Sequence, residues 1–230
     1  MRLYLVRHGE NPANVYHILS CRKADFRLTF RGRRQAHALG EQLRPHLPGD
    51  TAWWSSLLRR ARHTAELLAP PATTVRPLEN LRELDAGFLD GSGRTDHRRA
   101  YEAVITAWRA GDDTARFPGG ESLAEATARL ADALRVVAGF DPGGSAVVVG
   151  HGGLFTEGLR ALLSVDDRER FKDCHQPRWL NCEAAELTAG VAPDGHLELS
   201  WGAWHSPWLA RRHNGLGHTI PDPKGESLAR

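Results

Sequence analysis

The sequence has no apolar run close to the roughly 20 residues that a membrane-spanning helix needs. Its start also has no signal-peptide layout, because an apolar segment over residues 3–6 follows Met1 and Arg2 directly. These absences predict a soluble, cytoplasmic protein without a membrane partner. The chain carries no strong charge of either sign, since 30 basic and 28 acidic residues leave a net charge of +2. Such a balance does not favour nucleic acid as a partner.

Cysteine is scarce, with only Cys21, Cys174 and Cys182 in 230 residues. Their odd number and their spacing do not suit a disulfide framework or a metal site formed by the cysteines themselves. A chain of this length buries a sizeable core without such cross-links. We therefore expect reduced cysteines. No further set of His, Cys, Asp and Glu residues has the spacing of metal ligands, so we expect no metal, and we expect no other cofactor.

Short apolar runs alternate with segments of helical spacing, and this alternation predicts an α/β fold. Residues 3–6 and 146–149 are unbroken apolar runs, which are typical of central parallel strands covered on both faces. Helical spacing marks three segments: Ala36, Leu39 and Leu43; Leu58, Ala61, Ala65 and Leu68; and Leu123 to Val137, after a capping box formed by Ser122 and Glu125. We expect a three-layer sandwich, with a mostly parallel central sheet flanked by helices.

One α/β domain is predicted over residues 1–210. Within it, residues 85–120 are glycine-rich at both ends and hold a weaker helical pattern, so we expect a helical insertion that acts as a lid. Pro193-Asp194-Gly195 predicts a hairpin that closes one edge of the sheet. Residues 211–230, rich in glycine, proline and histidine, form a predicted C-terminal tail that docks on this subunit or on the partner of a homodimer.

A histidine flanked by glycine follows each of the two central apolar runs, in Arg7-His8-Gly9-Glu10 and Gly150-His151-Gly152-Gly153. Ligands of open α/β sheets bind beyond the carboxyl ends of the strands, where these histidines can face each other. Glycine lets a ligand approach the backbone closely, so we count Gly152 among the substrate-binding residues. Spacing alone does not decide which histidine is the nucleophile.

The ordered motifs over residues 1–208 resemble the histidine phosphatase superfamily, which includes the cofactor-dependent phosphoglycerate mutases. The resemblance is carried by Arg7-His8-Gly9-Glu10 with Asn14, residues 28–36, residues 55–65, Leu81-Arg82-Glu83-Leu84 with Gly87 and Gly91, Gly119-Gly120-Glu121-Ser122, and Gly150-His151-Gly152-Gly153. The combination is specific, although the arginine-histidine-glycine triplet alone is weak. A glycine after His151, where the acid phosphatase branch has an aspartate, favours the phosphoglycerate-mutase-like branch 1.

The resemblance implies a role for each site residue. His8 would be the nucleophile and form a phosphohistidine. Arg7 and Arg60 would grip the phosphoryl oxygens with their guanidinium groups, His151 would add a third donor, and Asn14 a neutral one. Glu83 would protonate the leaving alkoxide and then activate water. Glu10 is the rival acid, but its place in the nucleophile loop favours a structural role.

These residues predict a metal-independent hydrolase that acts on a small-molecule phosphate ester. A phosphoglycerate-type mutase is one alternative, although residues 84–93 lack the arginine-histidine-tyrosine-glycine string of the glycolytic mutases. A catalytically silent binding module is the other, although His8 and Glu83 are both present. Residues 92–116 carry five arginines and four acidic residues, a mixture that does not indicate a second anionic group on the substrate. Trp108, Trp201, Trp204 and Trp208 could line a pocket, but buried tryptophan is more often core.

Overall fold

The computed structural model describes residues 1–175 and 179–206. A six-stranded sheet lies at its centre, with the strand order β3-β2-β4-β1-β5-β6. The strands are β1 (Arg2–Arg7), β2 (Ala52–Ser56), β3 (Val75–Leu78), β4 (Ser145–Gly150), β5 (Ala184–Val191) and β6 (Leu197–His205). The first four run parallel, whereas β5 is antiparallel to β1 and to β6. The predicted mostly parallel α/β sheet is therefore confirmed.

Alternate residues of β1 point into two different cores. Leu3 and Leu5 belong to one buried cluster, and Tyr4 and Val6 belong to the other. This alternation follows from the two-residue period of a strand. Since both faces are covered, the strand is apolar throughout, as the sequence pattern indicates.

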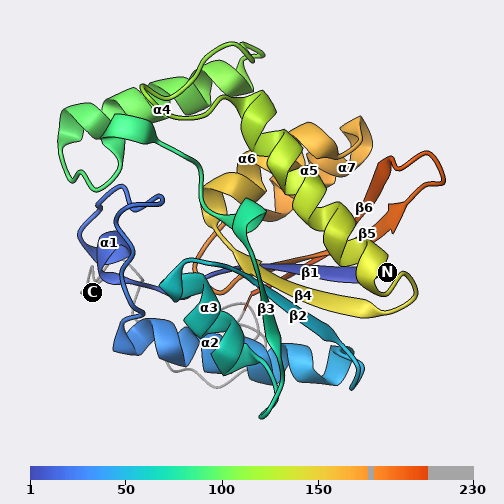
Figure 1. Cartoon of the computed structure of the whole chain (residues 1–230). Helices are drawn as coiled ribbons and strands as arrows, with labels where there is room; N and C mark the ends of the chain where they lie inside the picture. The colour runs from blue at the N-terminus through green and yellow to red at the C-terminus, as the bar shows by residue number, and fades with distance from the viewer. Residues whose placement is uncertain (176–178, 207–230) are drawn as a thin grey trace, which may run out of the picture.

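Helices cover both faces of the sheet (Figure 1). On one face lie α5 (Leu123–Phe140), α6 (Gly152–Leu162) and α7 (Val165–His175), and on the other α2 (Phe30–Leu43) and α3 (Arg59–Leu68). The predicted capping box begins α5, because the Ser122 hydroxyl accepts from the Glu125 amide at 3.3 Å and the Glu125 carboxylate accepts from the Ser122 amide at 2.8 Å. The three layers match the expected sandwich.

The predicted insertion contains the helix α4 (Thr95–Arg109), which lies with α1 (Pro12–Val15) beyond the end of β1 (Figure 1). Its apolar face packs on Phe117, which stacks on Tyr101 with ring centroids 4.8 Å apart and meets Trp108 edge-on at 5.0 Å. The insertion thus lies at the carboxyl ends of the strands, where the site is expected. Whether it opens as a lid stays a prediction.

The predicted hairpin is β5 and β6, and it closes one edge of the sheet. Trp201 is buried there and packs on Phe171, with Trp204 beside both, so these tryptophans belong to the core. Trp108 is buried as well. Trp208 and the predicted tail over residues 211–230 lie outside the described residues.

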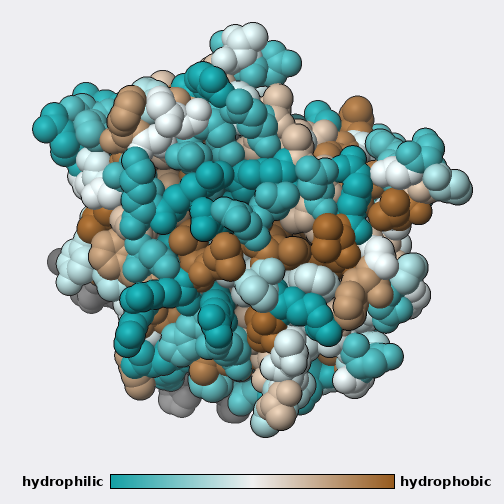
Figure 2. All heavy atoms as spheres, in the orientation of Figure 1, coloured by the Kyte–Doolittle hydropathy of each residue, from teal (hydrophilic) through white to brown (hydrophobic). Residues whose placement is uncertain are grey.

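The face seen in Figure 2 is mostly hydrophilic, with hydrophobic side chains showing in its middle between α5 and α3. None of the helices described here has the length and apolar character needed to cross a bilayer. Cys21 and Cys182 are buried and Cys174 is exposed, and all three are free thiols. Burial raises the pKa of the Cys21 thiol well above its ordinary value, which keeps it protonated.

Candidate active site

The two histidines lie where the chain leaves the sheet in opposite directions. β1 and β4 are parallel neighbours, yet α2, which follows β1, covers one face and α6, which follows β4, covers the other. Ligands bind at such a switch point in open α/β sheets, because the diverging helices leave a crevice between the strand ends. His8 and His151 are the residues directly after these strands, and their ring centroids are 5.2 Å apart.

A cavity of about 350 Å³ opens at this point. Six of the seven predicted site residues line it: Arg7, His8, Asn14, Arg60, Glu83 and Gly152. The seventh, His151, is fully buried beside His8. Segments far apart in the sequence, and the inserted helix α4, therefore contribute to one cavity.

The hydrogen bonds of His8 fix its tautomer. Nδ1 lies 2.7 Å from the Gly9 carbonyl oxygen, so Nδ1 must carry the proton and donate it. Nε2 is then the nitrogen with a lone pair, and it accepts a hydrogen bond from Nε of Arg60 at 3.2 Å. Burial and the charges of Arg60 and Arg7 hold the pKa of His8 well below its usual value. His8 is therefore a neutral imidazole with Nε2 available as a nucleophile.

Arg60 lies in the first turn of α3 and is 1% exposed, so it is not a surface arginine. Its Nη2 donates to the carbonyl oxygens of Ser20 at 2.8 Å and Cys21 at 3.0 Å, and Nη1 pairs with Asp25 at 3.3 Å. Burial lowers the pKa of Arg60 below its ordinary value. A guanidinium held from three sides brings a fixed positive charge to His8.

Arg7 ends β1 and donates from Nη1 to the carbonyl oxygen of Trp179. Its side chain passes directly over Gly152, where an added Cβ would lie 3.0 Å from Cδ and 3.1 Å from Nε of Arg7. Gly152 therefore leaves the room that the arginine occupies. This is the structural reason for a glycine after His151, besides the approach of a ligand.

His151 is the N-cap residue of α6, and its Nε2 is hydrogen-bonded to the Ser56 hydroxyl at 2.8 Å. Its Nδ1 is buried and has no hydrogen-bond partner among the described residues. Burial, followed by the charge of Arg60, lowers the pKa of His151 well below its ordinary value. A buried ring nitrogen without a partner is costly and suits a ligand atom that completes it.

Glu83 lies on the loop after β3, and three backbone amides fix its carboxyl group. Oε1 accepts from Leu84 at 2.9 Å and Leu154 at 2.7 Å, and Oε2 accepts from Gly153 at 3.0 Å. Two of these amides belong to the first turn of α6, whose N–H groups have no partner within the helix. An added Cβ on Gly153 would lie 2.8 Å from Oε1, so this glycine makes room for Glu83.

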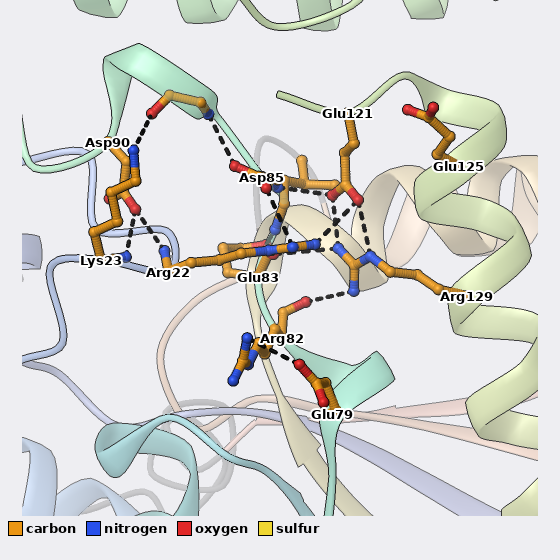
Figure 3. A network of polar contacts seen from close by, with 12 residues as sticks. Arg22, Lys23, Glu79, Arg82, Glu83, Asp85, Asp90, Glu121, Glu125 and Arg129 are labelled. Atoms are coloured by element: carbon orange, nitrogen blue, oxygen red, sulfur yellow. Dashed lines mark hydrogen bonds and ion pairs between the residues drawn. The ribbon is translucent and has the colours of Figure 1, made fainter. Parts of the chain in front are cut away.

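A network of ion pairs holds the backbone of this loop (Figure 3). Arg129 of α5 donates to the carbonyl oxygens of Asn80 at 2.9 Å, Arg82 at 2.7 Å and Glu83 at 3.2 Å. Arg22 also donates to the Glu83 carbonyl at 3.2 Å.

Glu121 joins the two arginines, since it pairs with Arg129 at 2.7 Å and Arg22 at 3.1 Å (Figure 3). It also accepts from the Asp85 amide at 2.7 Å. The network therefore fixes the backbone on both sides of Glu83. Glu121 belongs to the glycine-glycine-glutamate-serine motif, so this motif holds the loop that carries Glu83.

Three asparagines support the nucleophile loop. Asn11 and Asn14 form a capping box around α1, and Oδ1 of Asn14 also accepts from Asn181 at 3.2 Å. Asn181 in turn donates to the His8 carbonyl at 2.9 Å. Asn14 and Asn11 both line the cavity, and Nδ2 of Asn11 is buried without a partner among the described residues.

Glu10 turns away from the cavity. Its carboxylate accepts from the Thr29 hydroxyl at 2.8 Å, at the start of α2, and Arg31 lies 3.7 Å from it. It is not among the residues that line the cavity. Of the two glutamates, Glu83 therefore lines the cavity and Glu10 does not.

The sequence motifs do not point to Trp179 and Asn181, which precede β5 and contact Arg7 and His8 from the far side. No histidine, glycine or strand signal marks that segment. Within residues 1–175 and 179–206, no group of three His, Cys, Asp or Glu side chains could hold a metal ion. The donors that converge on the cavity are instead suited to phosphate oxygens.

The comparisons with known proteins agree with this geometry. A sequence profile described as histidine phosphatase superfamily (branch 1) matches residues 3–189. The chain is 30% identical over 214 residues to the probable phosphoglycerate mutase GpmB of Erwinia tasmaniensis, with 86% of this chain and 95% of that protein covered. It is 35% identical over 176 residues to a 2,3-bisphosphoglycerate-dependent phosphoglycerate mutase of Methylobacterium radiotolerans, with 72% and 78% covered.

Among solved structures, a mycobacterial glucosyl-3-phosphoglycerate phosphatase is similar, with a TM-score of 0.71 and 28% identity over 89% of this chain and 99% of the other. The fold, the site and these matches together show that the chain belongs to the histidine phosphatase superfamily, branch 1. The resemblance inferred from the motifs is thereby confirmed. Relatives named as phosphatases and as mutases both occur, so the family does not decide between the two reactions.

Proposed function

We propose that this protein is a phosphatase that hydrolyses a small-molecule phosphomonoester through a phosphohistidine on His8. The observation that carries the proposal is the orientation of His8, whose Nε2 is unprotonated, receives a hydrogen bond from Arg60 and borders a cavity that Glu83 also lines. Such a site combines a neutral nucleophile, fixed positive charge and a carboxyl group.

In the first step, Nε2 of His8 attacks phosphorus, and the bond from phosphorus to the ester oxygen breaks. Arg7, Arg60 and Nδ1 of His151 stabilise the charge that develops on the phosphoryl oxygens. The Nδ1–H of His8 keeps its hydrogen bond to the Gly9 carbonyl, which supports the ring as it becomes positively charged. Glu83 gives its proton to the departing alkoxide.

In the second step, water attacks the phosphohistidine. Glu83, now a carboxylate, takes a proton from that water, the N–P bond breaks, and inorganic phosphate leaves. His8 returns to its neutral form and Glu83 to its protonated form, so the cycle closes without a cofactor.

A phosphoglycerate mutase is the second candidate, and the names of the curated relatives favour it. A mutase must retain the phosphoenzyme while the product reorients, and it must bind the carboxylate of its substrate. The segment from Leu84 to Gly93 lacks the arginine-histidine-tyrosine-glycine string that accompanies that activity in the glycolytic mutases. Conversion of 3-phosphoglycerate to 2-phosphoglycerate without phosphate release would favour this candidate.

The deciding experiment combines rapid mixing with the Glu83→Gln variant. An alkyl phosphate needs a proton on its leaving oxygen, whereas p-nitrophenolate leaves without much help. The variant should therefore slow phosphorylation of His8 by the alkyl ester about 10²- to 10⁴-fold and by p-nitrophenyl phosphate far less. Dephosphorylation should be slow for both, so a burst of nitrophenol should precede a slow steady state.

Equal losses for the two substrates in the first step would show that Glu83 holds the cavity together and is not the acid. A wild-type protein that neither releases phosphate nor forms acid-labile phosphoenzyme with any ester would be a binding module, and the proposed function would be wrong.

A further inference from the structure

The outer part of the cavity is formed by α4 and α6. Two nitrogens of Arg109 in α4 donate to the carboxylate of Glu157 in α6. Nε lies 3.1 Å from Oε1 and 3.3 Å from Oε2, and Nη2 lies 2.5 Å from Oε1. Both residues line the cavity. The Glu157 side chain is 5% exposed, so its charge depends on this partner and on Arg160, 3.8 Å away.

Because of this pair, the net charge of the cavity wall differs between its two ends. Arg7 and Arg60 bring positive charge to the inner end beside His8, where the phosphoryl group would bind. At the outer end, Arg109 is already paired with Glu157, whose other partner, Arg160, is not among the residues that line the cavity. An anionic group there would have to draw Arg109 away and leave the buried Glu157 carboxylate with Arg160 alone, 3.8 Å away, which is costly.

Apolar groups also line the cavity. Ile18 and Leu19 come from the loop after α1, and Tyr101 and Ile105 come from α4. The ring of Tyr101 is held in place because it stacks on Phe117, with an interplanar angle of 19°. A substrate that fills the cavity from His8 to Arg109 therefore meets apolar groups, and the ring of Tyr101 is already in position.

We propose that the alcohol part of the substrate is uncharged and partly apolar, and that it carries a hydroxyl or amide group that hydrogen-bonds the Arg109–Glu157 pair. The inference rests on the proposed function and narrows its substrate class. Esters with a second phosphate or a carboxylate, such as phosphoglycerates and bisphosphates, are excluded as good substrates. The apolar part contacts Ile105 and Tyr101.

The test compares pairs of esters that share a skeleton, one member of each pair carrying a carboxylate away from the phosphate. Glycerol 3-phosphate and 3-phosphoglycerate share a three-carbon skeleton, and phenyl phosphate and 4-carboxyphenyl phosphate share a ring. We expect kcat/KM for the uncharged member of each pair to exceed that for the carboxylate by about tenfold or more. Equal or better hydrolysis of the carboxylates would overturn the inference and leave the proposed phosphatase standing. Phosphate release from none of the four would overturn the proposed function, and the inference with it.

The Glu157→Gln variant tests the cause of the preference. It keeps the shape of the side chain but releases the charge of Arg109, so the preference for uncharged esters should shrink about tenfold or reverse. The double variant Glu157→Gln/Arg109→Gln removes both charges and should restore the preference. Glu169→Gln removes the same charge from an exposed pair with Lys172 on α7 and serves as the matched control. An unchanged ratio in folded Glu157→Gln would mean that the pair does not set the preference.

A series of n-alkyl phosphates tests the apolar contact. Each added methylene that reaches the apolar side chains should raise kcat/KM about fourfold until the cavity is filled. Ile105→Ser should flatten this rise without changing the ratio between the charged and uncharged pairs. A flat series in the wild-type protein would overturn the apolar part of the inference.

Discussion

Nε of Arg60 donates a hydrogen bond to Nε2 of His8 across 3.2 Å, so the proposed nucleophile is held by one of the proposed phosphate ligands. The other nitrogens of Arg60 are fixed by backbone carbonyls and Asp25, and the guanidinium is therefore in place before a substrate arrives. When a phosphoryl group approaches Nε2, this N–H can turn to a phosphoryl oxygen with little movement. Preorganised donors of this kind lower the barrier because they need no rearrangement during the reaction.

A conservative change at Arg60 tests this arrangement. Arg60→Lys keeps the charge but cannot donate to His8 and to the Ser20 and Cys21 carbonyls together. We expect kcat/KM to fall about 10²-fold or more for alkyl and nitrophenyl phosphates alike, because the lost contacts act on the phosphoryl group. Arg62→Lys, on the exposed side of the same helix, is the matched control. A loss confined to alkyl esters would place Arg60 with the acid.

Alanine variants of the two histidines should lose activity in different ways. His8→Ala should abolish both turnover and the acid-labile phosphoenzyme, because no binding energy replaces the attacking atom. His151→Ala should slow turnover strongly yet still allow some phosphorylation of His8, since it removes only a donor to the transition state. Trapping with ³²P-labelled substrate and acid quench measures both. If phosphoenzyme accumulated in His8→Ala and not in His151→Ala, the two roles would be exchanged.

Both buried histidines should make the fold less stable in acid. Their pKa values are held below 6.5 in the folded state, so between 6.5 and the folded pKa the unfolded chain binds protons that the folded chain does not. Stability is therefore complete above about pH 6.5 and is lost as the pH falls, by up to about 1.4 kcal/mol per pH unit for each group.

Urea unfolding between pH 7.5 and 5 measures this dependence. His151→Gln should give a shallower slope than the wild type, because one of the two groups no longer titrates. Parallel curves for the two proteins would contradict the buried, neutral state of His151.

Much of the fold could be predicted from the sequence, because its signals are local. The apolar runs at residues 3–6 and 146–149 are strands, and the Ser122 capping box starts a helix as expected. The short strand Val75–Leu78 was not predicted, since it lies at the sheet edge, is only partly buried and contains a proline. The helix Val165–His175 was missed too, because its highly charged sequence has little helical apolar spacing.

The site was predictable where its residues sit in glycine-flanked motifs after strands. The tautomer of His8 and the partner of Arg109 were not predictable, because each depends on a group brought close only by the tertiary fold. The same holds for Trp179 and Asn181, which act through a backbone carbonyl or a side-chain amide with no sequence pattern.

Arg129 should act as a positioning residue for Glu83. Arg129→Gln loses three hydrogen bonds to the carbonyl oxygens of residues 80, 82 and 83. The carboxyl group of Glu83 should therefore be misplaced in the first step. We expect about a tenfold loss for an alkyl phosphate and a much smaller loss for p-nitrophenyl phosphate, whose leaving group needs little protonation. Arg135→Gln, on the same helix, is the control. Equal losses with a lower melting temperature would indicate a purely structural role.

Alanine substitutions at Gly152 and Gly153 should separate binding of the phosphoryl group by Arg7 from protonation of the leaving group by Glu83. A Cβ at Gly152 would press on Arg7, with contacts of 3.0 Å to Cδ and 3.1 Å to Nε, whereas a Cβ at Gly153 would press on Glu83, 2.8 Å from Oε1. Both positions are helical, so alanine itself is compatible with the backbone. Gly152→Ala should therefore displace Arg7 from the phosphoryl group and slow the hydrolysis of all esters by a similar factor, about tenfold.

Gly153→Ala should instead displace the acid and slow alkyl phosphates far more than p-nitrophenyl phosphate, because only the alkyl oxygen needs the proton. Gly139→Ala in α5, where an added Cβ meets nothing within 4 Å, controls for the substitution itself and should leave both rates unchanged. Steady-state and rapid-mixing kinetics with the two substrates measure the contrast. If both variants slowed the two substrates in the same pattern, Arg7 and Glu83 would be coupled through the start of α6. The separate roles of Arg7 as a phosphoryl ligand and Glu83 as the acid would then have to be abandoned.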